Sequence, residues 1–490
     1  MQYLIEYPMG KQRLESHMKQ MILNIKYEYE DGRISALDLI SAVINKLPLP
    51  LLEEYIQLLF LPLVLQLVND DSKKCRERVG ACITVLLSRL SVQVLQSLYE
   101  YALKWSEDGT GGQLQRTSVQ LFGFFLDARV DFMKKNSRVE TLVDYLRHRM
   151  EGEIGNVDHT SVLIAKEWEM IYFCLQTVEK VGNVQQTILW KNSQLWESII
   201  KCVAHPHPWV QLLASRTIHS QLSPCKLDHF EKINTNASSS IILKIPGSLF
   251  EITRNLCFQL NSEEEHQSND ISTMAIKNLS WIIKVMDTYP MLCFKDGEIS
   301  ELAADESDDE NAGSGGDKRR DPVTWLITRL SNIAKKRGSL RREAIFKCFA
   351  AFATVCDSNI ICSHLELILE PLNRVIVETE SRDERVTNAN RRSDAFGVSP
   401  ADLPKEVLQL LEDKCGTEEF MSALTSVKSK AREKRDTRKQ KVAVEAVKDP
   451  EAAAKRRIVK QVTEKERKKR RVEERKVGRG VFTKKPRHLG

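Results

Sequence analysis

Residues 51–90 read LLEEYIQLLFLPLVLQLVNDDSKKCRERVGACITVLLSRL, two apolar runs on either side of a short polar segment. Asp70 or Asp71 in that segment can cap the second helix by accepting hydrogen bonds from its free N–H groups. Pro62 is expected to bend the first helix, because it removes one backbone hydrogen bond. The second run repeats its apolar residues at the spacing of one helix face: Val79, Cys82, Ile83, Leu86, Leu87 and Leu90. The stretch therefore predicts two helices joined by a turn.

The spacing of Pro62, Asp70 and Arg76 is typical of a HEAT repeat, a helix pair of ~40–47 residues that stacks on its neighbours. A pair of this size cannot bury its apolar stripe alone, so successive pairs must form a continuous stack. No series of period-two alternation indicates a strand. Two further candidate pairs are 195–204 with 208–222 and 324–336 with 340–356. The predicted fold class is all-α: an α-solenoid of degenerate HEAT-like helix pairs with a basic C-terminal helical tail.

Polar segments divide the chain. Residues 262–270 are expected to form a polar loop. Residues 297–322 are acidic, rich in Gly and Ser and nearly devoid of apolar residues, a composition typical of disorder. The expected organisation is a HEAT-like solenoid at 1–296, an acidic disordered loop at 297–322, a continuation of the solenoid at 323–379, a flexible linker at 380–402, a short helical segment at 403–427 and a basic, largely helical tail at 428–490.

Composition favours an intracellular protein. The eleven cysteines form no CxxC pair, and several of them, such as Cys82, Cys202 and Cys348, lie among apolar residues, so we expect buried, reduced thiols. The first twelve residues are too polar for a signal peptide. The longest apolar run, 58–68, is shorter than the ~20 residues that span a bilayer. We expect a soluble chain with no membrane partner.

The sequence carries no signature of catalysis. Phosphate-binding, dinucleotide-binding, zinc-protease and serine-hydrolase motifs are all missing. We therefore expect no enzyme, no cofactor and no small-molecule substrate. His205 and His207 in HPHPW could join a metal site, but no Cys or carboxylate stands at ligand spacing. The favoured interpretation is a turn in which Pro208 begins the next helix and Trp209 anchors the turn in the groove between neighbouring pairs.

Ser307 precedes two aspartates and a glutamate in the acidic segment, a context that resembles an acidophilic kinase site. A phosphate there would add charge to a disordered loop and order nothing by itself. A phosphosite and a plain solvated insertion both stay open.

The charge of the chain is uneven. Residues 428–490 hold 25 Lys and Arg against 9 Asp and Glu, a net charge of +16, whereas the first 427 residues carry −10. Such asymmetry suggests a polyanionic partner. The candidate RNA-binding or import residues are Lys455, Arg456, Arg457, Lys460, Lys465, Arg467, Lys468, Lys469, Arg470, Arg471, Arg475 and Lys476.

These residues are expected on one long helix. Asp449, Pro450 and Glu451 are typical of a helix start, and Gly478 and Gly480 of a helix end. The helix would be roughly 40 Å long at ~1.5 Å per residue. A rod with cations on every face gains most by neutralising phosphates, and folded RNA is the favoured polyanion, bound through its backbone.

Two other uses of the tail stay open. Arg456 and Arg457 are separated by ten residues from the run 468–471, the spacing of a bipartite nuclear import signal. The tail could serve import alone, or it could simply be solvated.

Four segments, taken in order, resemble one known family. They are YLIEYPMGKQRLESHMKQMILNIKYEYEDGRISALDLISAVINKLP at 3–48, LPLVLQLVNDDSKKCRERVGACITVLLSRLS at 61–91, HPHPWVQLLASRTI at 205–218 and VAVEAVKDPEAAAKRRIVKQVTEKERKKRRVEE at 442–474. Together they resemble the C-terminal part of component twenty of the small-subunit processome, a HEAT-repeat family associated with snoRNA-guided ribosome assembly. The resemblance covers nearly the whole chain.

The resemblance implies a non-catalytic scaffold needed for processing of the small-subunit rRNA precursor, located in the nucleus and nucleolus, with possible presence in the nucleoplasm. Its implied partners are pre-rRNA, snoRNA-containing ribonucleoprotein and other processome proteins. The alternative is a HEAT-repeat adaptor or transport factor that binds only proteins and uses its tail for import. Family members are several times longer, so we expect residues 1–20 to expose an apolar face.

Overall fold

The computed structural model describes residues 10–107, 112–155, 168–225, 248–261, 269–289, 321–335, 342–386 and 402–480. Throughout these ranges the regular structure is helical, and no strand occurs in them. The chain divides into two compact units, Met1–Lys414 and Cys415–Gly490. The predicted all-α solenoid of helix pairs is confirmed in the first unit.

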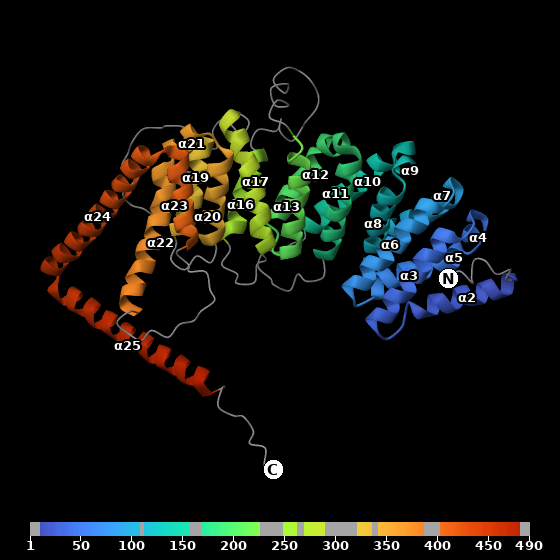
Figure 1. Ribbon diagram of the computed structural model, residues 1–490, viewed down its shortest axis with the longest axis horizontal. Coiled ribbons are helices and arrows are strands. Elements are labelled where there is room, and N and C mark those ends of the chain that lie inside the picture. Colours follow the sequence, from blue (N-terminus) through green and yellow to red (C-terminus); the bar gives the residue numbers. More distant parts are fainter. Residues whose placement is uncertain are drawn as a thin grey trace, which may run out of the picture. The chain divides into compact units, whose positions relative to one another are not determined.

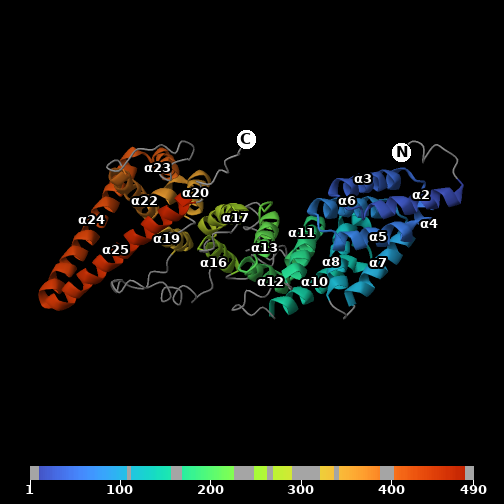
Figure 2. The same ribbon diagram turned by 90° about the horizontal axis from the view of Figure 1, so that it is seen from below.

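The helices of the first unit alternate between two rows (Figures 1 and 2). Second helices of successive pairs contact one another without a break from α3 to α20. First helices contact the second helix of their own pair and, in most repeats, the first helix of the next. The first row holds α2 (Lys11–Asn24), α4 (Leu49–Glu54), α5 (Ile56–Asn69), α7 (Val92–Glu107), α9 (Val130–Lys134), α10 (Arg138–Gly155), α12 (Ser193–Val203), α16 (Ser248–Asn261), α19 (Pro322–Lys335), α21 (Ser358–Ser363) and α22 (Leu365–Val386).

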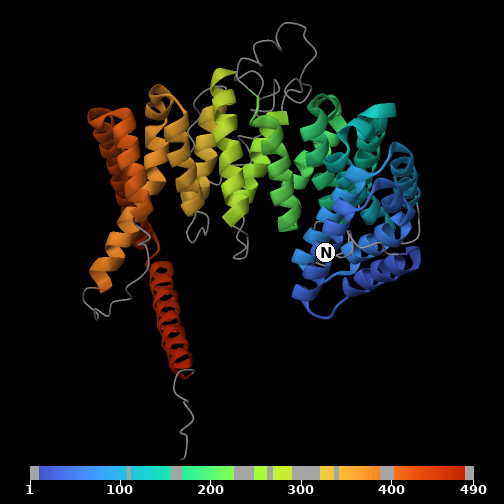
Figure 3. The ribbon, with the colours of Figure 1, turned by 45° about the vertical axis from the view of Figure 1, so that its right-hand side comes forward.

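The second row is continuous. In Figure 3 its members from α13 (green) to α20 (amber) stand side by side. A single 3₁₀ turn, Lys135–Ser137, lies between α9 and α10. The second row holds α3 (Glu30–Lys46), α6 (Lys73–Arg89), α8 (Gln113–Ala128), α11 (Trp168–Lys191), α13 (Pro208–Leu222), α17 (Asn269–Thr288) and α20 (Arg342–Val355). The first unit also includes α23 (Asp402–Cys415) up to Lys414.

The helix pair predicted at 51–90 is confirmed, and its stripe from Val79 to Leu90 is buried to 2% exposure or less. Each such side chain adds ~1.5–3 kcal/mol of hydrophobic stabilisation. The first helix differs from the prediction, because it is interrupted at Tyr55 and becomes α4 and α5, with Pro62 inside α5. The later pairs α12–α13 and α19–α20 are also confirmed.

The capping prediction for α6 is wrong. Ser72 is the N-cap, and its hydroxyl accepts a hydrogen bond from the Cys75 amide at 3.3 Å. Asp70 does not cap the helix because its carboxylate is buried against Arg33 on α3. The Arg33 guanidinium donates to both Asp70 oxygens at 3.0 Å and to Asp71 at 3.1 Å.

The Arg33–Asp70 pair joins the first two helix pairs. The Asp70 side chain is fully buried, and that of Arg33 is 10% exposed. Gln66 and the Ser72 amide also donate to Asp70, at 2.5 and 2.8 Å. Arg76 donates to the backbone carbonyl of Asp70 at 2.6 Å, which closes the turn. Two of the three residues that mark the repeat in the sequence, Asp70 and Arg76, therefore belong to one bonded network.

Buried amide side chains make similar links further along. Gln259 on α16 donates to the Val203 carbonyl at 2.7 Å, and Asn278 on α17 donates to the Ser215 carbonyl at 2.9 Å. Both amides are almost fully buried. Because a buried side-chain amide without an acceptor costs ~1–3 kcal/mol, these contacts fix the register between repeats.

Some boundaries fall elsewhere than the sequence suggests. Helix α22 continues to Val386, past the linker start expected at 380, and α17 begins at Asn269, inside the expected polar loop. The other residues of that loop, and nearly all of 297–322, lie outside the described residues. Within residues 10–20, Leu14 is half-buried and Met18 is buried, so this part shows no exposed apolar face.

The Arg33–Asp70 pair predicts a large stability effect. Asp70→Asn would leave the Arg33 guanidinium buried without its main carboxylate, and we expect the free energy of unfolding to fall by about 3 kcal/mol. Urea unfolding followed by circular dichroism measures it. Asp38→Asn is the matched control, since Asp38 pairs with Arg78 at 3.5 Å on the surface and should cost less than ~1 kcal/mol. Equal losses in the two variants would contradict the assigned role.

The same pair predicts a pH dependence. Burial raises the pKa of Asp70, but the hydrogen bonds from Ser72, Gln66 and Arg33 outweigh it and hold the pKa below its ordinary value. A lowered pKa stabilises the fold above the unfolded value of about 3.9, and this gain is lost as pH falls through the folded pKa. The stability gap between wild type and Asp70→Asn should therefore be complete near neutral pH and shrink in acid. A gap that is constant from neutral pH to strong acid would contradict this assignment.

Candidate nucleic-acid interface

The basic tail is built from two long helices of the second unit, α24 (Thr417–Lys448) and α25 (Pro450–Gly480). Pro450 begins α25, as the sequence predicts, and the helix continues through Gly478 to Gly480, the last described residue. Pro is favoured at the first helical position because its missing N–H has no partner there in any case. At ~1.5 Å per residue, the 31 residues of α25 span about 46 Å.

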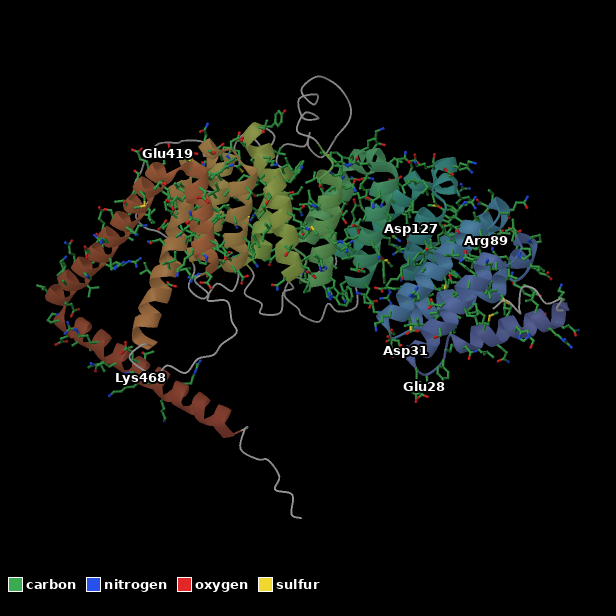
Figure 4. All side chains as sticks on the ribbon, viewed as in Figure 1. Glu28, Asp31, Arg89, Asp127, Glu419 and Lys468 are labelled. Atoms are coloured by element: carbon green, nitrogen blue, oxygen red, sulfur yellow. The ribbon has the colours of Figure 1, made fainter. Side chains whose placement is uncertain are left out.

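All twelve predicted site residues lie on α25. Figure 4 shows Lys468 on this helix. The cations in the run 468–471 are ~100° apart around the helix axis, so they point to all sides. The side chains whose exposure is described, all of them exposed, are Lys455, Arg457, Lys465, Lys468, Lys469 and Arg470. For Arg456, Lys460, Arg467, Arg471, Arg475 and Lys476 only the helical backbone is described.

Helix α25 buries none of its described apolar side chains. Ile458, Val459 and Val462 are 60, 64 and 49% exposed. These three are the only large apolar residues between Lys455 and Arg470, so no other residue of this stretch could give the helix an apolar contact face. A helix stabilised by neither packing nor a partner is marginal in water. The structure therefore presents α25 as a charged rod rather than as part of a core.

Helix α24 extends the basic surface, and the site prediction missed it. Phe420 and Val427 are buried, whereas the cations from Lys428 onward are exposed. The helix runs without a break through residue 427, where the sequence suggested a boundary. The number of cations could have revealed this part of the basic surface, because nine Lys and Arg lie between residues 428 and 448.

The HPHPW segment is a turn, as predicted. His207 is the N-cap of α13, with its Nδ1 accepting from the Trp209 amide at 3.3 Å, and Pro208 is the first helical residue. His205 Nδ1 accepts from the His207 amide at 3.0 Å. The Nδ1 atom of each imidazole therefore accepts a hydrogen bond from a backbone amide. Trp209 does not anchor the turn in a groove, because its side chain is 60% exposed.

Burial holds several cysteine thiols in their neutral form. Burial raises the pKa of Cys174 to about 12 and that of Cys82 to about 11. A thiol becomes a nucleophile or metal ligand only as the thiolate. In the ranges that the structure covers, the cysteines are unbridged and no cluster of His, Cys, Asp or Glu is suited to a metal.

Ser307 lies outside the described residues. In the described part of the chain, no helix combines the length and the apolar character that crossing a membrane requires.

The comparisons with known proteins identify the family. Residues 115–474 match the model described as small subunit processome component 20 homolog, C-terminal. The chain belongs to this family. It is 24% identical over 482 residues to U3 small nucleolar RNA-associated protein 20 of Saccharomyces cerevisiae, and 25% identical over 467 residues to the protein of that name in Schizosaccharomyces pombe. These alignments cover 96 and 93% of this chain but only 18 and 17% of the relatives, so the chain spans under a fifth of their length.

The solved structures that match include importin beta and a karyopherin. Importin beta gives a TM-score of 0.41 at 12% identity, covering 83% of this chain and 44% of importin beta. The karyopherin Kap121p, bound to the C-terminus of Cdc14p, gives a TM-score of 0.39 at 12% identity, covering 87% of this chain and 40% of Kap121p.

The exposure of α25 predicts its hydrogen exchange. Backbone amides of 455–470 should exchange at least ~100-fold faster than those of the buried stretch of α6, because the described side chains of α25 are not packed into a core. Exchange measured by mass spectrometry on the free chain compares both helices in one sample. Protection of α25 equal to that of α6 without any partner would show that it packs on its own chain.

Proposed function

We propose that this chain is a scaffold segment of the small-subunit processome that acts in ribosome biogenesis, with no chemistry of its own. The solenoid binds other processome proteins, and α25 contacts the pre-rRNA backbone. The proposed location is the nucleus and nucleolus. Family membership and the U3 small nucleolar RNA named in the relatives support the assembly. The observation that carries the RNA contact is the exposure of α25, a basic helix without a core.

Charge is the physical basis of the contact. Helix α25 carries thirteen Lys and Arg against five Asp and Glu. Phosphates bound by these cations release condensed counterions, and this release drives binding. The local charge density is largest between Lys465 and Arg471, where six of seven residues are basic. Neighbouring RNA strands can approach this segment from several sides, since its cations surround the axis.

The contact is expected to read backbone rather than sequence. Helix α25 contains no Phe, Tyr or Trp, so it offers no ring on which a splayed base could stack. Phosphate contacts fix position and orientation but carry no sequence information directly. Specific placement of the chain in the particle would then come from protein contacts of the solenoid.

A protein-only adaptor is the second candidate. It is favoured by the bipartite spacing on α25, in which Arg456 and Arg457 precede the run 468–471 by ten residues. In this alternative the tail delivers the protein to the nucleus and then has no further role. The two proposals differ in what the tail does after import.

Neutralising the tail should weaken RNA binding. Six substitutions to Gln, at Lys455, Arg457, Lys465, Lys468, Lys469 and Arg470, remove exposed cations without removing helix formers. We expect the slope of log affinity against log salt to fall by ~1 for each phosphate that the variant no longer binds. Fluorescence anisotropy with a structured RNA measures it.

The matched control neutralises six exposed solenoid lysines: Lys26, Lys46, Lys201, Lys277, Lys284 and Lys347. It removes the same charge from the chain as a whole. Equal loss of affinity in both variants would show that net charge, rather than α25, binds the RNA.

Replacing residues 449–480 with an unrelated import signal separates the two candidates in cells. The scaffold proposal expects nuclear delivery but defective small-subunit rRNA processing, because the cations that bind the phosphates are gone. Processing is measured from the precursor lengths of the rRNA. Full rescue of growth and processing by the foreign signal would favour the adaptor.

A further inference from the structure

Four aromatic rings gather where α11 and α13 begin, and together they are called the aromatic surface: Trp168, Tyr172, His207 and Trp209. The ring of Trp168 stacks on that of His207 with centroids 3.9 Å apart and planes within 5°. Trp209 meets Trp168 edge to face, at 5.3 Å and 79°. Tyr172 lies 6.1 Å from Trp168 and 6.5 Å from Trp209. These residues lie in the first unit, apart in sequence from the basic tail.

The aromatic surface is open to solvent at Trp209, whose side chain is 60% exposed, while the other three rings are partly exposed. A single exposed apolar residue needs no explanation, but clustered rings with polar edges are typical of interaction sites. Tryptophan is also among the residue types enriched in binding hot spots. From the sequence we expect Trp209 to anchor the turn in the groove between neighbouring pairs. Its exposure shows that it does not do so.

Local contacts position the rings of the aromatic surface. Pro208 fixes the start of α13, and His207 Nδ1 accepts from the Trp209 amide. Glu169, next to Trp168, pairs with Arg116 of α8 at 2.7 Å, which ties the start of α11 to its neighbour. Preorganised sites bind more tightly because less freedom is lost on binding.

Among the described residues, the aromatic surface carries no net charge. Burial lowers the pKa of His207, so the imidazole carries no charge at neutral pH. Arg116 and Glu169 form an ion pair, so their charges cancel. A nucleic-acid strand needs cations along its phosphates, and single-strand binding sites combine stacking rings with a positive groove. The aromatic surface therefore suits an uncharged ligand with flat, rigid rings.

We propose that the aromatic surface binds a proline-rich, extended segment of a partner protein, with prolyl rings packing on Trp209, the most exposed of its four rings. Proline-rich segments in the polyproline II conformation dock on aromatic grooves at low entropic cost. The indole N–H of Trp209 and the hydroxyl of Tyr172 supply donors for the ligand's backbone carbonyls. This inference goes beyond the proposed RNA contact and gives the solenoid a defined class of protein ligand.

The test uses the full chain carrying the six tail substitutions to Gln, so that α25 does not contribute. The probes are a capped, fluorescent decaproline peptide and a fluorescent oligouridine of ten nucleotides. We expect saturable binding of decaproline, at least tenfold weaker binding for Trp209→Ala, and an intermediate affinity for Trp209→Phe. Tyr101→Ala is the matched control, since Tyr101 is a 46% exposed ring on α7, and it should leave the affinity unchanged.

Three results would overturn the inference. The first is no saturable binding of decaproline by the parent chain. The second is equal affinity in Trp209→Ala and Tyr101→Ala when circular dichroism shows both folded. The third is binding of oligouridine, but not decaproline, that Trp209→Ala abolishes, because the surface would then bind bases. None of these results bears on α25, so failure here is distinct from failure of the RNA contact.

Discussion

A helix pair of this chain cannot cover its own apolar stripe. The stripe of α6 is buried because α3, α5 and α8 all pack against that helix. The same arrangement repeats through α11, α13, α17 and α20. Each pair therefore depends on the next for most of its hydrophobic stabilisation, and the stack of residues 10–386 follows from this single constraint.

Buried polar links give the stack its register. Apolar stripes can slide past one another at little cost, but a buried carboxylate or side-chain amide must keep its hydrogen-bond partners. Arg33 with Asp70 does this between the first two pairs, and Gln259 and Asn278 do it further along. Helix α25 has neither a stripe nor such links among its described residues, which is why its partner must be sought outside the helix.

The sequence predicts the helices and helix pairs, because these depend on the local spacing of residues. The helix pairs at 51–90 and 193–222, and the start of α25 at Pro450, follow from spacing and proline. It does not predict what depends on a distant residue. Asp70 looks like a helix cap until Arg33, 37 residues earlier, is seen to occupy its carboxylate. Trp209 looks like a core anchor until its exposure is known.

The central claim is that α25 lies among RNA phosphates inside an assembled particle. Ultraviolet crosslinking of the protein in cells, with crosslinked peptides and ribonucleotides both identified, tests this claim most directly. The account predicts that peptides from 450–480 carry nucleotides of the small-subunit rRNA precursor, scattered over sequences that share no motif. Crosslinks confined to the solenoid, with none from α25, would contradict it.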